Sequence, residues 1–488
     1  FKNHILYRGY DNNGDRVLRK EYFKPTLFVS VKEKTDWKGL DGSTVAPIDF
    51  DSMFEANQWL KQNLDVAGRH IYGNKKFVQQ YITDKFPRDI EFKREDINVG
   101  TFDIETDYDD GFPHPNEASQ RVLAITYKSS KFSTYHVWGY GEFDKETALI
   151  GDVKYTRCNS EEELLSKFLD FWSHPDVIPD VITGWNTRFF DIPYIVNRTA
   201  KVLGIGVLSK FSPWELPLEH RKIIRRGSET EVYEIPGIQT LDYMELFQKF
   251  GYSYGPQESY ALNHIANVVL GEKKLSFEES GSLKNLYRDD HQKYIDYNMK
   301  DVQLVDRLEE KMGLITLALT IAYKGGVNYQ DTFGTTAIWE SIIYRKLNLN
   351  KVVVPIDVSE KPYRPFAGGY VKDPQIGRHS WIVSFDLNSL YPNLIVQYNM
   401  SPETLVDSTQ MNDVGYYLSG HKVTSEYAVA ANGSSYRKDV DGVLPQIIEE
   451  FYDERVSVKK MQLAAQKQIQ GGYTHELDKE INTMENRQ

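Results

Sequence analysis

Two carboxylates share one face of a short run of strand-forming residues, Val99–Thr106. Because successive side chains of a strand point to opposite faces, Asp103 and Glu105 lie on one side and the apolar Phe102 and Ile104 lie on the other. Like charges this close are costly unless solvent or a cation relieves them. The pair therefore predicts either a divalent metal site or a solvent-exposed edge strand.

Two later segments carry acidic residues in related positions. Residues 180–186 are typical of a strand and a turn, and Asp191 follows at the predicted start of a helix, where a negative charge is favourable by itself. A second helix is predicted from about residue 290 to 311, and its Tyr297 and Asp301 are four residues apart and hence on one face. Taken singly, these residues also fit an ordinary helix terminus and an ordinary helix surface.

A second candidate site lies at residues 381–395. The pattern predicts a strand over 381–387, a tight turn, and a helix with Pro392 near its start. Asp386 lies at the end of the strand and next to the helix N-terminus. An aspartate in that position can hold a metal ion and a polyphosphate together, although a buried strand with one aspartate also occurs without any such role.

Basic and glycine residues flank this second site. Arg455 and Lys459 are four residues apart on a long helix predicted from Pro445 to Gln470, where they either face solvent or clamp phosphates. Gly368 and Gly369 either form an ordinary turn or let the backbone approach a ligand closely.

The remaining pattern predicts a multidomain protein of the α/β and α+β classes. Residues 1–97 read as a small α+β module, and from 99 to about 313 strands alternate with helices, which favours a mixed sheet covered by helices. Residues 221–234 predict a β-hairpin with a basic first strand, and the looser pattern from 325 to 374 suggests a connector.

Composition narrows the functional classes. The chain has 488 residues, 40% hydrophobic and 26% charged, as in globular proteins of roughly three domains. Its net charge of −12 argues against nucleic-acid binding by bulk charge alone, without excluding local basic clefts. The single cysteine, Cys158, excludes an intramolecular disulfide and suits a reducing cytoplasm, and the longest apolar run, residues 312–323, is too short to cross a membrane.

The order of these segments resembles that of a known family. Asp-x-Glu on a strand, then Asn-x-x-x-Phe-Asp, then Tyr-x-x-x-Asp are similar to the three exonuclease motifs of DEDDy-class 3′–5′ exonucleases. The run Asp-Leu-Asn-Ser-Leu-Tyr-Pro from Asp386 is similar to the first palm motif of family B DNA polymerases, and departs from it at Asn393 and Leu394, beyond the catalytic aspartate. The resemblance is strongest to the family B polymerases of T-even-type bacteriophages.

For the exonuclease, the resemblance implies a two-metal site on a ribonuclease-H-like domain. Four carboxylates would bind two Mg²⁺ or Mn²⁺ ions, one activating water and the other stabilising the leaving oxygen of a phosphodiester. Tyr297 would orient the attacking water, and the hairpin at residues 221–234 would help to separate primer from template unless it is simply exposed to solvent. The implied metal ligands are Asp103, Glu105, Asp191 and Asp301.

For the polymerase, the resemblance implies a partial palm and partial fingers. Asp386 would bind the two Mg²⁺ or Mn²⁺ ions that accompany the nucleotide, the backbone of Ser389 and Leu390 would contact the triphosphate, and Tyr391 would exclude a 2′-hydroxyl group. Further contacts, to the triphosphate or to the template strand, are implied for Arg455, Lys459, Gly368 and Gly369.

The resemblance also implies a domain order. The order is an N-terminal domain at residues 1–97, an exonuclease domain at 98–313, a return segment of the N-terminal domain at 314–357, a partial palm at 358–441 and partial fingers at 442–488.

Two motifs of the family, Lys-x-x-x-Asn-Ser-x-Tyr-Gly and Asp-Thr-Asp-Ser, do not occur in the sequence. We therefore expect a proofreading 3′–5′ exonuclease that does not extend a primer without the rest of palm, fingers and thumb, supplied by a second chain if the polymerase is naturally divided. Expected partners are primer-template and single-stranded DNA, deoxynucleoside triphosphates and, only through that missing part, a sliding clamp. The alternatives are a stand-alone 3′–5′ exonuclease and a non-catalytic DNA-binding or assembly subunit, and the expected location is the cytoplasm, that of the host if the protein is viral.

Overall fold

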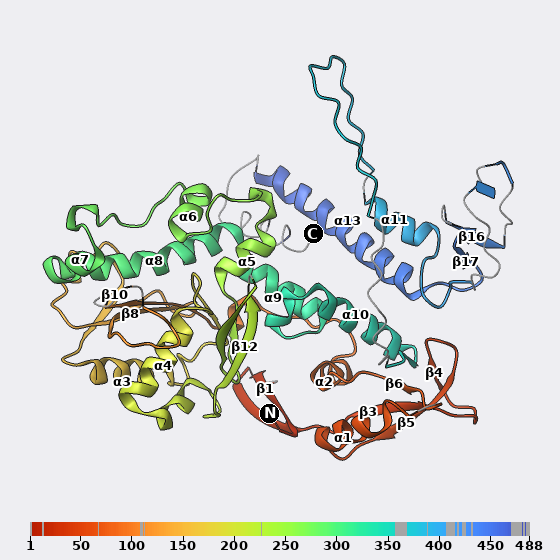
Figure 1. The fold of residues 1–488 in the computed structure, drawn as a ribbon, viewed down its shortest axis with the longest axis horizontal. Coiled ribbons are helices and arrows are strands. Elements are labelled where there is room, and N and C mark those ends of the chain that lie inside the picture. Colours follow the sequence, from red (N-terminus) through yellow and green to blue (C-terminus); the bar gives the residue numbers. More distant parts are fainter. Residues whose placement is uncertain are drawn as a thin grey trace. The chain divides into compact units, whose positions relative to one another are not determined.

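The computed structural model of the chain contains two compact units (Figure 1). The first unit comprises Phe1–Ile5, Glu21–Arg88 and Trp339–Leu463, and the second comprises Leu6–Lys20, Asp89–Ile338 and Ala464–Gln488. The structure describes residues 2–11, 14–66, 68–107, 111, 113–225, 227–356, 368–387, 389–406, 415–416, 419–421, 426–430, 433–469, 481 and 484.

The second unit is built on a six-stranded mixed sheet with the strand order β10-β9-β8-β7-β11-β14. β8 runs antiparallel to both of its neighbours, whereas the pairs β7–β11, β11–β14 and β9–β10 are parallel. The order β9-β8-β7-β11-β14 is that of a ribonuclease-H-like fold, so the predicted fold class is confirmed. The strands are Val99–Thr106 (β7), Val122–Ser129 (β8), Tyr135–Gly139 (β9), Val153–Arg157 (β10), Val181–Thr183 (β11) and Gln239–Thr240 (β14).

The strand that carries the first two carboxylates lies inside this sheet. β7 is paired with β8 on one side and with β11 on the other. Its residues are buried apart from Asp103, which is partly buried. The alternative prediction of a solvent-exposed edge strand is therefore wrong, because β7 has a paired strand on each side.

Helices cover both faces of the sheet (Figure 1). α3 (Glu161–Trp172) and α4 (Asp191–Leu203) pack on the face that carries Phe102 and Ile104. α8 (His291–Met312) packs on the opposite face, against β7, β8 and β9. The side chain of Asp290 caps the start of α8 and Gly313 ends it in a left-handed conformation, so the helix predicted over 290–311 is confirmed.

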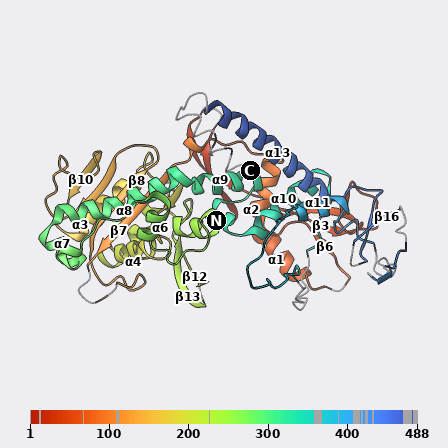
Figure 2. The same ribbon diagram turned by 90° about the horizontal axis from the view of Figure 1, so that it is seen from above.

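The rest of the second unit surrounds this core. Asp180, just before β11, binds Arg8 and Arg16 of the hairpin β1–β2 at 2.9 and 2.5 Å. The predicted hairpin at residues 221–234 is confirmed as β12–β13, which projects beside α4 in Figure 2. These elements are β1 (His4–Tyr10), β2 (Arg16–Tyr22), β12 (Glu219–Arg225), β13 (Ser228–Glu234), α5 (Tyr243–Phe250), α6 (Leu262–Leu270), α7 (Leu283–Asp289), α9 (Leu314–Gly325) and the 3₁₀ helices Arg94–Asp96, Ile205–Phe211, Tyr252–Tyr254, Glu278–Ser280 and Tyr329–Phe333.

The first unit contains a five-stranded sheet in the order β15-β4-β5-β3-β6. β15 comes from more than 300 residues later in the sequence than its neighbour β4, so the chain returns to its N-terminal sheet. An apolar cluster that includes Leu27, Phe50 and Leu60 packs α1 onto this sheet. The elements are β3 (Thr26–Ser30), β4 (Trp37–Gly39), β5 (Thr44–Asp49), β6 (Ile71–Tyr72), β15 (Val352–Val353), α1 (Met53–Asn63) and α2 (Phe77–Lys85), with α10 (Thr335–Leu349) spanning the boundary between the units.

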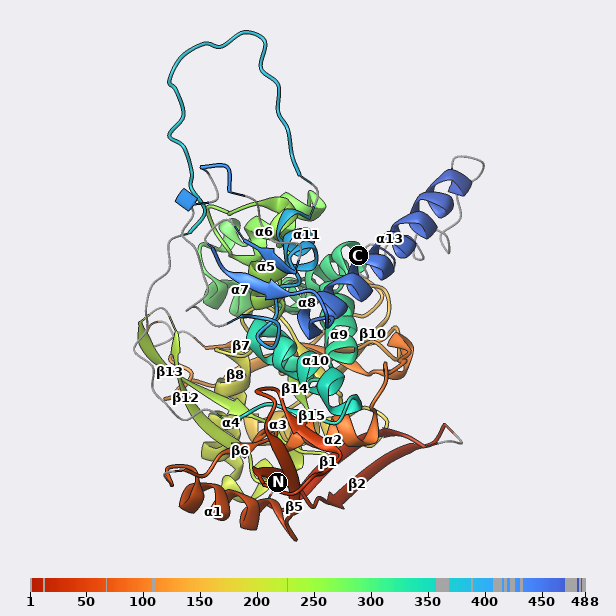
Figure 3. The ribbon, with the colours of Figure 1, turned by 90° about the vertical axis from the view of Figure 1, so that its right-hand side faces the viewer.

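Two sequence predictions for the C-terminal third are wrong. Residues 325–374, predicted to be a connector, contain a helix, α10. Residues 381–387, predicted to be a strand, form none. Figure 3 draws residues 368–387 as an extended trace, and their apolar side chains, such as Trp381 and Phe385, are exposed. A strand needs hydrogen-bonded neighbours, and no described residue pairs with this segment.

Helices and a short hairpin complete the first unit. α11 (Leu390–Gln397) confirms the helix expected after the turn. α13 (Val443–Ile469) confirms the long helix predicted from Pro445, and it belongs to the first unit as far as Leu463. The hairpin pairs β16 (Tyr427–Val429) with β17 (Ser435–Arg437). None of the helices formed by the described residues combines the length and apolar character needed to span a bilayer.

Candidate active site

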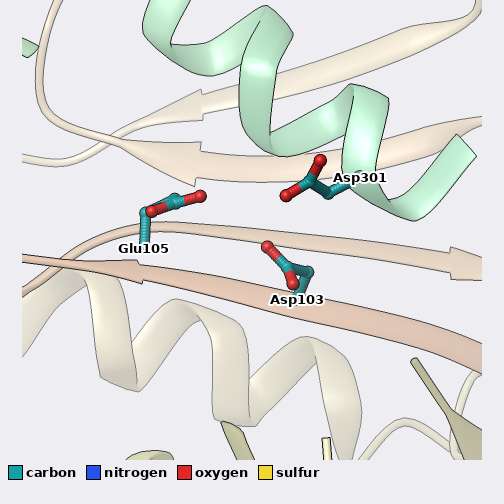
Figure 4. Close-up of side chains that lie close together, drawn as sticks. All are labelled: Asp103, Glu105 and Asp301. Carbon is teal, nitrogen blue, oxygen red and sulfur yellow. The ribbon is translucent and has the colours of Figure 1, made fainter. Parts of the chain in front are cut away.

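Three carboxylates from β7 and α8 converge between the sheet and the helix (Figure 4). Asp103, Glu105 and Asp301 each contribute one oxygen to a group in which all these atoms lie within 4.8 Å of one another. Tyr297 and Asp301 are only 6% and 4% exposed, so the interpretation of this pair as an ordinary helix surface is wrong. The central position of β7 and the length of α8 bring together residues about 200 positions apart.

Asp191 lies beside this group and is not one of its three members. It is the first residue of α4, as the sequence predicted, and its Oδ1 accepts a hydrogen bond from the backbone nitrogen of Ile104 at 3.1 Å. Asp191 is therefore held against β7 at Ile104, the residue between Asp103 and Glu105 in the sequence. The structure brings all four predicted acidic residues to one region.

The turn before Asp191 is held by a residue that the sequence analysis missed. The carboxylate of Asp242, at the start of α5, accepts hydrogen bonds from the backbone nitrogens of Asn186 and Arg188 at 3.3 and 3.0 Å. It also caps α5 through the backbone nitrogens of Met244 and Glu245. An aspartate before a helix signals a cap, but nothing in the sequence signals that the same carboxylate fixes a distant turn.

Burial and mutual repulsion disfavour the charged forms of these carboxyl groups. Burial, followed by the charges of Asp191, Asp301 and Glu105, raises the pKa of Asp103 well above its usual value. Burial raises the pKa of Glu105 to about 8, with the charge of Asp301 adding to it, and raises the pKa of Asp191 to about 7. A bound cation would relieve this repulsion.

The residues present fit a divalent cation. The Oδ1 atom of Asp301 is buried and has no hydrogen-bond partner among the described residues. A buried carboxylate oxygen without a donor is an anomaly that an oxygen-seeking cation would satisfy. Carboxylates are also the ligands that Mg²⁺ and Mn²⁺ prefer in proteins.

Lys274 is the second residue that the sequence analysis missed. Its ammonium group forms an ion pair with Oδ2 of Asp301 and donates to the hydroxyl oxygen of Tyr297 at 3.4 Å. Burial lowers the pKa of Lys274, but the charges of Asp301, Tyr297 and Asp103 outweigh it and raise the pKa above its usual value. Lys274 is therefore charged and offsets part of the negative charge, yet its sequence surroundings contain no motif that would reveal this.

Divalent ions should stabilise the folded chain more at about pH 8 than at about pH 5. The pKa of Glu105 is about 8 in the folded chain, against an ordinary value of 4.5. The native state therefore holds an extra proton between those values, and the stability that this proton provides is lost as the pH rises through about 8. We expect the rise in melting temperature caused by Mg²⁺ to grow with pH, as measured by thermal unfolding. Because the pKa values of Asp103 and Asp191 are raised as well, Glu105→Gln should show a weaker pH trend rather than none. An equal rise in melting temperature at both pH values in the parent would disagree with this account.

The predicted polymerase residues lie in the first unit and are only partly brought together. Nη1 of Arg455 donates to Oγ of Ser389 at 3.3 Å, and a Cβ atom on Gly369 would lie 3.6 Å from the hydroxyl oxygen of Tyr391. Asp386 and Lys459 are exposed, and none of the contacts described for the chain joins them to the other predicted residues. Gly368, which precedes residues 370–387, and Leu390, which follows them, are also exposed.

The group of carboxylates thus lies on the ribonuclease-H-like sheet of the second unit. Residues 51–265 match the family description "DNA polymerase family B, exonuclease domain". Residues 332–475 match "DNA polymerase family B". The chain belongs to DNA polymerase family B, as the sequence motifs predicted.

Curated relatives agree with this assignment. The chain is 32% identical to a DNA-directed DNA polymerase of Escherichia phage RB69 and 31% identical to one of Enterobacteria phage T4, each over 95% of this chain and 53% of the relative. It is also 27% identical to a DNA polymerase delta catalytic subunit of Candida albicans, over 74% of this chain and 35% of the relative. The chain thus spans about half the length of the phage relatives that it matches.

Proposed function

We propose that this chain is a metal-dependent 3′–5′ exonuclease that also provides the first half of a DNA polymerase site. The observation that carries the proposal is the convergence of three carboxylates from β7 and α8, within 4.8 Å of one another, in a family B exonuclease domain. Two Mg²⁺ or Mn²⁺ ions bound by Asp103, Glu105, Asp191 and Asp301 would activate water and stabilise the leaving 3′ oxygen.

The chain's own residues orient the reaction. Lys274 donates to the hydroxyl oxygen of Tyr297, which leaves the hydroxyl proton of Tyr297 free to donate to the attacking water or to the scissile phosphate. The positive charge of Lys274 also favours an approaching phosphate. The substrate would be a single-stranded DNA 3′ end, bound through its backbone and stacked bases rather than its sequence.

The direction of cleavage tests the exonuclease proposal. With a single-stranded oligonucleotide and Mg²⁺, a 5′ label should appear in a ladder of shortening products, whereas a 3′ label should be released at once as a mononucleotide. The Asp191→Ala variant should neither shorten the 5′-labelled DNA nor release the 3′-labelled mononucleotide. Early release of a 5′-labelled mononucleotide, or cleavage at internal positions, would refute the proposed polarity.

The polymerase half is proposed to need the rest of the family B polymerase domain. The exposed apolar side chains of residues 370–387 suit a palm strand that pairs with a segment outside these 488 residues. That segment would belong either to a longer form of the chain or to a second chain, and a sliding clamp would bind only through it. The proposed nucleotide and template residues are Asp386, Ser389, Leu390, Tyr391, Arg455, Lys459, Gly368 and Gly369.

The contact between Arg455 and Ser389 supports this second site. In this proposal the guanidinium group of Arg455 binds the triphosphate of the incoming nucleotide at the N-terminus of α11, where Ser389 occupies the N-cap position. Asp386 would hold the nucleotide-associated metal ions, with primer-template DNA as the second substrate. The implied domain limits and the cytoplasmic location stay predictions of the sequence.

Two alternative functions remain as outcomes of the same test. A stand-alone exonuclease would trim single strands and gain nothing from the rest of a polymerase. A non-catalytic DNA-binding or assembly subunit would show no carboxylate-dependent Mg²⁺ or Mn²⁺ binding. The convergence of four acidic residues favours catalysis over the second alternative.

A further inference from the structure

One of the carboxylates is held by a chain of two buried neutral side chains. Nδ2 of Asn298, on α8, donates to Oδ2 of Asp103 at 2.6 Å. Oδ1 of Asn298 accepts a hydrogen bond from the hydroxyl of Thr126 at 2.5 Å. Thr126 lies directly opposite Asp103 in the register of β7 and β8, so the three side chains form a short bridge from the strand pair to the helix.

The chemistry of the three groups fixes the direction of both hydrogen bonds. A carboxylate that binds a cation is ionised and only accepts, so in that state Asn298 must present its amide NH₂ group to Asp103. The amide oxygen then faces Thr126, whose hydroxyl is the donor. Asn298 and Thr126 are both 0% exposed, so a rotation of the amide would leave buried polar atoms without partners.

We propose that Asn298 is a positioning residue of the metal centre, with Thr126 as its support. Together they hold the carboxylate of Asp103 in one orientation toward Glu105 and Asp301 before a cation binds (Figure 4). This inference rests on the proposed function, because it assumes that the carboxylate group binds divalent ions.

A neutral donor suits this task better than a charged one. The amide of Asn298 fixes the orientation of Asp103 without cancelling the negative charge that attracts the cation. Lys274 contrasts with it, because Lys274 neutralises charge at Asp301 on the other side of the group. Hydrogen-bond partners of metal ligands typically contribute about 10- to 100-fold to metal affinity.

Direct titration with Mn²⁺ tests the proposal on the full 488-residue chain. Free Mn²⁺ is measured by electron paramagnetic resonance, so that binding is read without any cleavage assay. Asn298→Ala should weaken Mn²⁺ binding by about 10- to 100-fold. Thr126→Val should weaken it in the same direction, whereas Thr126→Ser, which keeps the hydroxyl, should restore binding to nearly that of the parent.

Ser129→Ala is the matched control for loss of a buried hydroxyl. Ser129 lies on the same strand as Thr126, is 0% exposed, and donates to Oδ1 of another buried asparagine, Asn98, at 2.7 Å. It contacts none of the carboxylates, so its replacement should leave Mn²⁺ affinity unchanged even if it lowers the melting temperature. If Ser129→Ala and Thr126→Val weaken Mn²⁺ binding equally, the positioning role is refuted and only a general structural effect remains.

The metal centre itself is tested separately by Asp103→Asn. Mn²⁺ binding in the parent that is lost in Asp103→Asn establishes the metal site, whatever Asn298 does. Parent-like binding in both Asn298→Ala and Thr126→Val would then overturn the positioning role alone. Absence of carboxylate-dependent binding in the parent would overturn the metal centre, and the positioning role with it.

A cleavage assay adds a second readout. Because Asn298→Ala keeps all four acidic residues, its cleavage rate should recover as the Mn²⁺ concentration approaches saturation. The concentration of Mn²⁺ that gives half of the maximal rate should rise by the same factor as the dissociation constant. A lower maximal rate with an unchanged half-saturating concentration would refute the positioning role.

Discussion

Replacing Asp301 with asparagine should lower the rate of 3′ nucleotide removal by at least about a thousandfold. The substitution keeps the size of the side chain but removes the negative charge of a proposed metal ligand, and it leaves Lys274 without its ionic partner. The loss is measured with 5′-labelled DNA under single-turnover conditions in Mg²⁺. Thermal unfolding of the same sample separates loss of the site from loss of the fold.

Asp306→Asn is the matched control for Asp301→Asn. Asp306 lies on the same helix, and its carboxylate accepts hydrogen bonds from Thr101 and Tyr135 at 2.6 and 3.3 Å. Like Asp301, it lies on the side of α8 that faces the sheet, but it is not one of the three grouped carboxylates. We expect Asp306→Asn to change stability more than the cleavage rate, and equal losses of rate in the two variants would contradict the assignment of Asp301.

In a polymerase that contains this chain together with the rest of the domain, Asp386→Asn should abolish primer extension and leave exonuclease activity intact. Asp386 is the proposed palm carboxylate, and it lies in the first unit, whereas the proposed exonuclease carboxylates lie in the second. We expect a loss of extension of at least about a thousandfold. Asp191→Ala should show the reverse pattern, with extension retained and exonuclease activity lost.

This pair of variants separates two sites on one chain. Both activities are measured on the same primer-template, with and without deoxynucleoside triphosphates. Loss of both activities in Asp386→Asn would mean that Asp386 supports the fold of the whole protein rather than a separate polymerase site.

Local patterns predicted the elements of the exonuclease site. The alternation in Val99–Thr106 and the four-residue spacing of Tyr297 and Asp301 each depend on residues close together in the sequence, and both were confirmed as β7 and α8. Their convergence was implied only by the resemblance to a family. Lys274 and Asn298 were missed because their roles depend on packing across distant elements, such as the contact of Asn298 with Thr126.

The wrong predictions have a common physical cause. Residues 381–387 have the apolar character of a buried strand, but a strand forms only where neighbouring strands accept its hydrogen bonds. α10 was missed because Gly and Pro residues on either side of it obscured its pattern. The burial of its side chains, such as that of Tyr344, depends on packing against other elements of the fold. Local sequence carries little information about such partners.

The most direct test of the central claim uses these 488 residues alone with a 5′-labelled primer-template and Mg²⁺. The account predicts that the primer is shortened by the parent and not by Asp191→Ala, and that added deoxynucleoside triphosphates produce no extension. Equal shortening by the parent and Asp191→Ala, or no shortening by either, would contradict the exonuclease assignment. Extension of the primer would contradict the proposal that synthesis needs the rest of the polymerase domain.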